Sequence, residues 1–184
     1  ELGTLVHEIL AGKTGPWPQA ALELAAVFEG SELGRRAGTA DRVEREWDFI
    51  AEIEATLVRG TVDLWFQDER GRVIVDYKTD DVSAAEAVAR AREYAPQLAL
   101  YAIALGESRA FLHFLRPNLV VEVPVDAAAQ SSARRLIAEL RHAQNSLGFD
   151  LRTGDHCNSC PFYRGLCPAN LSGIDEEKST IEAE

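Results

Sequence analysis

The stretch that decides the fold runs from Leu57 to Asp80 and reads LVRGTVDLWFQDERGRVIVDYKTD. Two runs rich in β-branched and aromatic residues flank the polar segment QDERG, which ends in Gly71. Such runs are typical of strands, and a glycine that closes a short polar segment is typical of a tight turn. The pattern therefore predicts an antiparallel hairpin whose turn is centred between Glu69 and Arg70.

In that register Asp63 lies opposite Asp76, with the two Cβ atoms about 5 Å apart. Side-chain alternation puts Lys78 on the same face and an apolar set on the other face. That set is Val62, Leu64, Val73, Val75 and Tyr77. Two facing carboxylates repel each other, so the pair indicates a bound cation, and hard oxygen ligands suit Mg²⁺ or Mn²⁺. The alternative is a solvent-facing pair with Lys78 as its ion-pair partner, although aspartate is depleted in strands.

The order of elements in the rest of the sequence predicts an α/β protein whose sheet has helices on its flanks. Hydrophobic periodicity and turn residues give the element boundaries. The predicted helices are 4–10, 19–28, 84–94, 96–105 and 127–147, the further strands are 43–53, 109–115 and 119–125, and 30–38 is predicted to be a loop. Glu44 and Glu46, on the strand before the hairpin, are expected to be surface residues rather than ligands.

The composition is that of a globular domain. The chain has 184 residues, of which 46% are hydrophobic and 27% charged, and these values exclude a disordered or collagen-like chain. The longest apolar run, Leu98 to Leu105, is too short to span a bilayer, so no membrane partner is expected. Three cysteines and no signal peptide favour a cytoplasmic location. With no methionine and a start at Glu1, the chain is expected to be a piece of a larger polypeptide.

The net charge of −11 argues against nucleic acid as a partner, unless a bound cation masks part of it. The cysteines gather in one segment as Cys157, Cys160 and Cys167, and C-x2-C-x6-C is metal-ligand spacing. Three interpretations stay open for them: an iron–sulfur cluster, a zinc site that includes His156, or no metal. The acidic tail over 171–184 is expected to be mobile.

Four short motifs follow one another along the chain. They are Gly3-Thr4-Leu5-Val6-His7, Gly60-x-x-Asp63, Val75-Asp76-Tyr77-Lys78-Thr79 and Gln97-x-x-x-Tyr101. In this order and at this spacing they resemble the PD-(D/E)XK nuclease superfamily. More narrowly, they resemble the RecB/AddA-type nuclease domain at the C-terminus of UvrD-like helicase–nucleases. The resemblance covers about residues 1–170. It implies a restriction-endonuclease-like fold, with a central mixed sheet flanked by helices and a C-terminal Cys-rich segment.

The resemblance also implies the site. The Mg²⁺ or Mn²⁺ ligands would be His7, Asp63, Asp76 and the backbone carbonyl of Tyr77. The catalytic residues would be Asp63, Asp76 and Lys78. Gln97 and Tyr101 would face the active site or the DNA strand. In relatives, a cysteine segment of this kind holds a [4Fe–4S] cluster with a fourth cysteine from upstream of the first motif. This chain has no fourth cysteine, so a cluster would belong to the full-length parent.

The implied function is metal-dependent, exonucleolytic hydrolysis of DNA in double-strand break repair. The implied partners are a single DNA strand, a helicase domain in the same polypeptide that delivers it, and, left open, a second helicase–nuclease subunit. The alternative is a catalytically silent domain that binds a DNA strand for such a complex. The expected organisation is a nuclease core over 1–150, a Cys-rich segment over 151–170 that packs on it, and the acidic tail.

Overall fold

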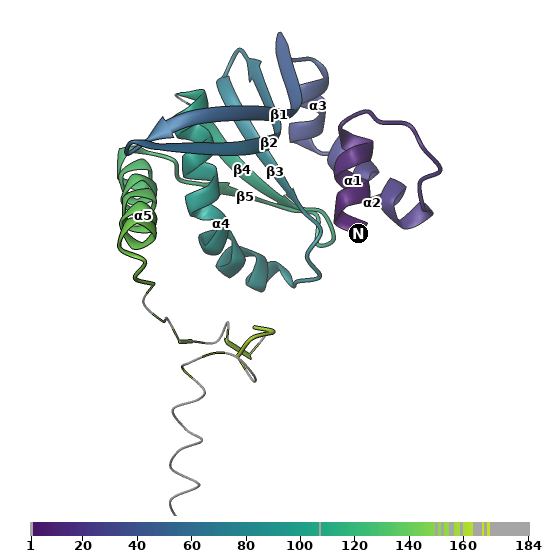
Figure 1. Ribbon diagram of the computed structural model, residues 1–184. Coiled ribbons are helices and arrows are strands. Elements are labelled where there is room, and N and C mark those ends of the chain that lie inside the picture. Colours follow the sequence, from purple (N-terminus) through teal and green to yellow (C-terminus); the bar gives the residue numbers. More distant parts are fainter. Residues whose placement is uncertain are drawn as a thin grey trace, which may run out of the picture. The chain divides into compact units, whose positions relative to one another are not determined.

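The computed structural model describes residues 2–106, 108–149, 151, 153, 154, 157, 158, 160–163, 167 and 169. Its centre is a five-stranded sheet in the order β1-β2-β3-β4-β5 (Figure 1). The strands are β1 (Arg42–Ile53), β2 (Thr56–Asp68), β3 (Gly71–Lys78), β4 (Arg109–Phe114) and β5 (Leu119–Val123). Neighbouring strands are antiparallel except β3 and β4, which are parallel. The mixed sheet predicted from the sequence is therefore confirmed.

Helices cover both faces of the sheet. They are α1 (Leu2–Leu10), α2 (Gln19–Glu29), α3 (Glu32–Gly38) and α4 (Ala84–Leu105), and a further helix, α5 (Ala127–Ser146), follows β5 in the chain. One buried cluster joins α1, α2 and α3 to one face through residues such as Leu64, Phe66 and Val75. A second cluster joins α4 to the other face through Trp65 and Ile74. α4 is also the crossover that parallel pairing of β3 with β4 requires.

The chain divides into two compact units, residues 1–141 and 142–184, and α5 runs from the first into the second. The boundaries expected from the sequence, 1–150 and 151–170, stay a prediction. The tail over 171–184 lies outside the described residues. None of the helices in the described ranges has the length and apolar content needed to cross a membrane.

The register of the deciding hairpin is as predicted. β2 and β3 pair Gln67 with Arg72 and Leu64 with Val75, and Gly71 has a φ of 104°. A positive φ at this position is the reason for glycine. The paired ladder ends at Leu64, so Asp63 lies at the point where β2 leaves β3.

One prediction about the hairpin is wrong, because Val62 packs in the α4-side cluster and not beside Leu64. The same change of face occurs in β1. Arg45 donates to the Leu10 carbonyl of α1 at 2.8 Å, whereas Trp47 packs on the α4 side. The pairs on either side share one register, but the pair between them, Glu46 with Asp63, is missing from the ladder. Glu46 has a φ of 47°, so the backbone turns over at this point and reverses the alternation.

Two helix predictions also need correction. The segment predicted to be a loop contains α3, which Ser31 caps by accepting a hydrogen bond from the Gly34 N–H at 3.0 Å. A Cβ at Gly34 would collide with the main-chain oxygen of Phe28, so this glycine serves close packing rather than flexibility. α4 is one helix and not two. Pro96 removes only one main-chain donor, and the carbonyl that loses it belongs to exposed Arg92.

Gly60 makes a testable contribution to the fold. It pairs with Phe49, and a Cβ at position 60 would lie 2.7 Å from that ring. We expect Gly60→Ala to lower the free energy of unfolding by about 1–3 kcal/mol, because Phe49 is buried and packs on Tyr101 at 5.9 Å. Urea unfolding measures the loss. Gly38→Ala is the control, since a Cβ there meets nothing within 4 Å, and equal stability of the two variants would contradict the packing argument.

Candidate active site

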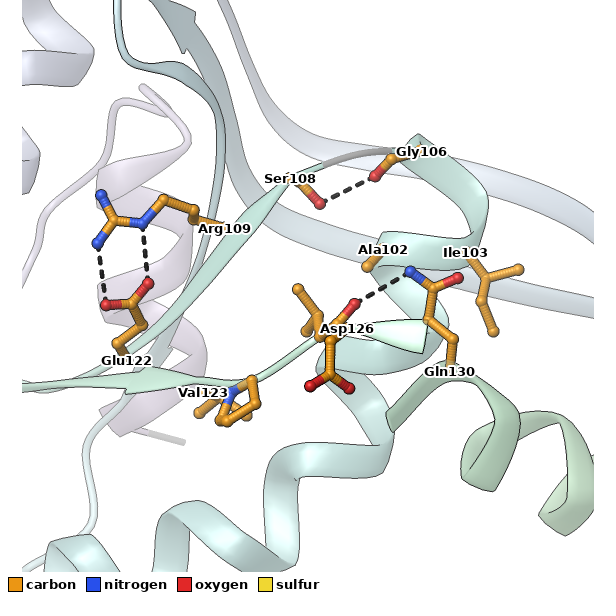
Figure 2. A pocket seen from close by; sticks show the side chains of 11 residues that line it. Ala102, Ile103, Gly106, Ser108, Arg109, Glu122, Val123, Asp126 and Gln130 are labelled. Carbon is orange, nitrogen blue, oxygen red and sulfur yellow. Dashed lines mark hydrogen bonds and ion pairs between the residues drawn. The ribbon is translucent and has the colours of Figure 1, made fainter. Parts of the chain in front are cut away.

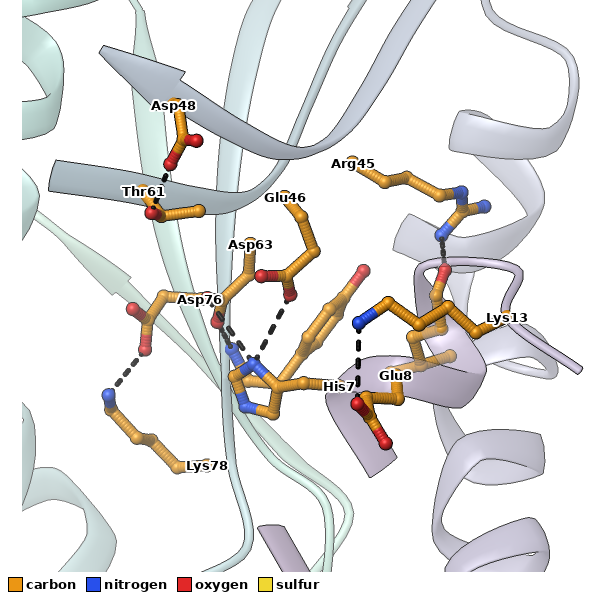
Figure 3. A network of polar contacts seen from close by, with 12 residues as sticks. His7, Glu8, Lys13, Arg45, Glu46, Asp48, Thr61, Asp63, Asp76 and Lys78 are labelled. Atoms are coloured by element: carbon orange, nitrogen blue, oxygen red, sulfur yellow. Dashed lines mark hydrogen bonds and ion pairs between the residues drawn. The ribbon is translucent and has the colours of Figure 1, made fainter. Parts of the chain in front are cut away.

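The candidate site lies where β2 separates from β3 (Figure 3). Here the Asp63 carboxylate replaces a ladder hydrogen bond, because its Oδ2 accepts the Tyr77 N–H at 2.9 Å. The side chain of Asp63 is 12% exposed, and its second oxygen points toward α1. Asp63 therefore holds the main chain of Tyr77 with one oxygen and leaves the other for a ligand.

His7 reaches this carboxylate from α1. Its Nδ1 lies 3.4 Å from Asp63 Oδ1, and its ring meets the Tyr77 ring edge-on at 5.7 Å. Gly3 fixes the helix close to the end of β3, because a Cβ there would lie 2.9 Å from the Thr79 hydroxyl oxygen. The structure thus brings together the predicted residues His7, Asp63 and Tyr77.

Glu46 joins them: it lies at the surface, as the sequence pattern predicted, but it also approaches the site, which was not predicted. Its Oε1 lies 3.6 Å from His7 Nδ1, and its side chain is 39% exposed. One ligand atom each from His7, Glu46 and Asp63 lies within 4.8 Å of the other two. The signal that was missed is the β1–β2 turn. Glu54 and Ala55 both have positive φ, and a turn centred between them puts Glu46 opposite Asp63.

The electrostatics of this cluster indicate a place for positive charge. The hydrogen bond with Asp63 raises the pKa of His7 above its usual value. Burial and the nearby Asp63 carboxylate raise the pKa of Glu46. The Asp63 carboxylate contributes to both upward shifts, whereas burial raises the pKa of Glu46 and acts to lower that of His7.

Asp76 and Lys78 form the second half of the site. The Lys78 Nζ lies 2.7 Å from Asp76 Oδ2, and their side chains are 17% and 1% exposed. Burial is the main cause that raises the pKa of Asp76, to about 7, and the Asp63 carboxylate adds to it. Lys78 acts in the opposite direction without cancelling the effect. Asp76 is therefore a carboxylate whose ionised form needs more positive charge than the lysine supplies.

Gln97 and Tyr101 approach Asp76 from α4. The amide Nε2 of Gln97 donates to Asp76 Oδ1 at 3.1 Å and to the Tyr101 hydroxyl oxygen at 2.6 Å. Ser83 and Glu86 fix the start of this helix with a capping box. The structure brings both α4 residues to the site, and contact between them and DNA stays a prediction.

A pocket of about 590 Å³ opens beside these groups. Its described lining is Gly3, Thr4, His7, Glu46, Tyr77, Lys78, Thr79 and Asp80. A second pocket, of about 480 Å³, lies at the ends of α4 and β5 (Figure 2). Its charged residues are already satisfied, since Arg109 binds Glu122 through two contacts of 2.8 and 2.9 Å and Asp126 accepts the Ala129 N–H. The first pocket is therefore the candidate active site.

The residues present fit a divalent cation. An imidazole nitrogen and carboxylate oxygens converge in the His7–Glu46–Asp63 cluster, and buried Asp76 is coupled to Asp63 by charge repulsion. This donor set suits Mg²⁺ or Mn²⁺. A cation would relieve the repulsion that raises the pKa values of Glu46 and Asp76.

The cysteine segment is described in part. Among the described residues, Cys157, Cys160 and Cys167 are not joined by disulfide bonds, and the Cys160 N–H donates to the Cys157 carbonyl at 3.2 Å. Within the described part of the chain, the one group of potential metal ligands is His7, Glu46 and Asp63, so the thiols do not form one. His156 lies outside the described residues. A cluster or zinc site at these cysteines stays a prediction.

Comparison with known proteins adds the family. The sequence model of the PD-(D/E)XK nuclease superfamily matches residues 1–168. The chain is 40% identical over 86 residues to an ATP-dependent helicase/nuclease protein of Anoxybacillus flavithermus, an alignment that covers 44% of this chain and 7% of that protein. It is 38% identical over 99 residues to the ATP-dependent helicase/nuclease protein of Desulforudis audaxviator, covering 46% and 8%. The chain thus spans less than a tenth of these relatives.

The fold has a solved counterpart. The crystal structure of SSO0001 superimposes with a TM-score of 0.51 at 19% identity, covering 92% of this chain and 70% of that one. The restriction-endonuclease-like arrangement, a central mixed sheet flanked by helices, is confirmed. The family model matches residues 1–168, and contacts between side chains link His7, Asp63, Asp76, Lys78, Gln97 and Tyr101 in one neighbourhood, so the chain belongs to the PD-(D/E)XK nuclease superfamily.

Proposed function

We propose that this chain is a metal-dependent nuclease domain that hydrolyses phosphodiester bonds of DNA. The observation that carries the proposal is the pair of buried Asp76 and half-buried Lys78, 2.7 Å apart, next to the His7–Glu46–Asp63 cluster. A structural ion pair would not need two further acidic groups, Glu46 and Asp63, beside it. A site for a cation and a phosphate group accounts for all of them.

His7, Asp63 and Asp76 would hold the cation, with Glu46 as a further ligand and the Tyr77 carbonyl completing the set. A bound divalent cation supplies charge for phosphate oxygens and lowers the pKa of a coordinated water. Lys78 would stabilise negative charge on the phosphate and orient the attacking water. Gln97 would keep Asp76 in place through the 3.1 Å hydrogen bond.

The context we propose is a helicase–nuclease. The relatives in Anoxybacillus flavithermus and Desulforudis audaxviator carry that name, and the present chain matches a small part of each. A helicase domain in the same polypeptide would deliver a single strand, and cleavage would be exonucleolytic, in repair of double-strand breaks. Delivery suits a chain with a net charge of −11, because such a chain attracts DNA weakly by itself. A second helicase–nuclease subunit is a further proposed partner.

A cleavage assay tests the proposal against its alternative, a silent strand-binding domain. The chain is incubated with end-labelled single-stranded oligodeoxynucleotide and Mg²⁺, Mn²⁺ or EDTA. We expect shortening of the strand with either cation and none with EDTA. Binding without cleavage, measured by fluorescence anisotropy with each cation, would favour the silent domain instead.

Glu46 gives a prediction about the cation itself. We expect Glu46→Gln to weaken Mn²⁺ binding about tenfold, because a charged ligand becomes neutral while its volume is kept. Isothermal titration with Mn²⁺ measures the change without DNA. Glu44→Gln is the matched control, since Glu44 lies on the same strand and pairs with exposed Arg42. Unchanged Mn²⁺ affinity in Glu46→Gln would show that Glu46 is not a ligand of the cation.

A further inference from the structure

One face of α4 carries three polar aromatic or amide side chains toward the site. Tyr94, Gln97 and Tyr101 stand at positions i, i+3 and i+7 of the helix, so they share a face. Gln97 contacts Asp76, and Tyr101 contacts Gln97. Tyr94, which belongs to none of the four sequence motifs, contacts the remaining member of the buried pair, Lys78.

The contact is between a cation and an aromatic face. The Lys78 Nζ lies 4.1 Å from the centre of the Tyr94 ring, well inside the range in which the ring attracts an ammonium group. The tyrosine is half-buried against the α4-side core. Its hydroxyl lies 3.5 Å from Asp80 Oδ2, which adds a polar contact at the far end of the ring. The position of the Tyr94 ring is therefore fixed by packing against the core and by the hydroxyl contact with Asp80.

The ring matters because of the geometry of lysine. The ammonium group stands on a flexible four-carbon stem and carries three N–H donors. Asp76 accepts one of them at 2.7 Å. An aromatic face attracts the ammonium group from a second direction, yet it is not an acceptor that competes with a phosphate oxygen or a water for the other N–H groups. With its position fixed by Asp76 and by the Tyr94 ring, the ammonium group keeps an N–H donor oriented toward the reacting groups.

We propose that Tyr94 is a positioning residue for Lys78, holding the ammonium group in the direction that the reaction needs. The inference rests on the proposed function, because it assigns Tyr94 a part in the same reaction. The ring carries the effect and the hydroxyl group adds little. Phenylalanine should therefore replace Tyr94, and leucine should not.

The contact itself is tested without metal or DNA. The sequence holds three lysines, Lys13, Lys78 and Lys178, so a chain labelled with ¹³C-lysine gives a simple NMR spectrum. The signal lost in Lys78→Arg identifies Lys78. We expect its Hε protons to be displaced upfield from the random-coil position by the ring, equally so in Tyr94→Phe, and to return to it in Tyr94→Leu. A Lys78 signal that is unmoved by Tyr94→Leu would overturn the proposal.

Single-turnover cleavage of a labelled single-stranded oligodeoxynucleotide with Mg²⁺ tests the consequence. We expect Tyr94→Phe to stay within about twofold of the parent, and Tyr94→Leu to be about tenfold slower at an unchanged half-saturating concentration. A melting temperature close to the parent's shows that Tyr94→Leu is folded, and Tyr94→Met replaces it if it is not.

The two proposals fail differently. If the parent chain cleaves and Lys78→Ala does not, but Tyr94→Leu equals the parent, the positioning role is wrong and the nuclease stands. If the parent does not cleave with any divalent cation, the proposed function is wrong, and the NMR comparison still decides whether the ring holds the ammonium group.

Discussion

Lys78→Ala should lower Mg²⁺-dependent cleavage of single-stranded DNA at least about 100-fold. The Lys78 side chain is 17% exposed and its Nζ lies 2.7 Å from Asp76 Oδ2, so alanine removes the one positive side chain in contact with that buried carboxylate among the described residues. Negative charge that develops on the phosphate would then lack a partner in a site with little water. Single-turnover rates on a labelled oligodeoxynucleotide measure the loss, and circular dichroism checks the fold.

Lys13→Ala is the matched control for this variant. Lys13 pairs with Glu8 at 3.3 Å on the surface, and its side chain is 59% exposed, so its loss removes the same charge outside the Asp76–Lys78 pair. We expect Asp76→Ala to lose activity as Lys78→Ala does. Cleavage by Lys78→Ala at the parental rate would remove the proposed role of the lysine, whatever the metal dependence of the parent.

In metal-free buffer, the folded chain should become less stable as the pH rises from 4 to 8. Asp76 has a pKa of about 7 when folded and 3.8 when exposed, so between these values the folded state keeps a proton that the unfolded state has lost. Stability falls with pH wherever the folded state binds more protons. The raised pKa of His7 acts in the same direction above 6.5. Melting temperatures between pH 4 and 8 in EDTA should fall by several degrees.

Asp76→Asn isolates the cause, because it keeps the shape of the side chain and removes the titration. Subtracting the melting temperature of the variant from that of the parent at each pH removes the contributions of other groups. One of these is buried His113, whose lowered pKa acts in the opposite direction below pH 6.5. Mg²⁺ at pH 8 should restore the stability of the parent and affect Asp76→Asn much less. Parallel pH curves for the two proteins would show that Asp76 is not the destabilising carboxylate.

The part of the site built by local pairing could be predicted from the sequence. The turn before Gly71 sets the register of β2 against β3, and this register brings Asp63 to the neighbourhood of Asp76 without knowledge of the rest of the fold. The spacing of Gln97 and Tyr101 likewise fixes both on one face of α4. Both relations depend on residues that are close in the sequence, which is why the sequence pattern predicts them.

The parts that escaped prediction depend on contacts distant in the sequence or on unusual backbone. The left-handed φ of Glu46 cannot be read from the alternation of polar and apolar residues in β1. The approach of Glu46 to His7 and the change of face at Val62 were therefore missed. α3 was missed because its glycines resemble loop residues. Gly34 is in fact required by the close approach of Phe28.

The interrupted ladder at Glu46 and Asp63 has a meaning for how this scaffold could change over generations. Two acidic residues and a left-handed φ within the β1–β2 ladder cost stability, so selection for catalytic activity is what would keep them. If cleavage is no longer needed, β-branched residues at these two positions would allow β1 and β2 to form the missing pair of the ladder. The same fold would then persist as a tougher and inert framework. Retention of the interrupted ladder would thus distinguish a domain of this fold that still cleaves from one that has lost its activity.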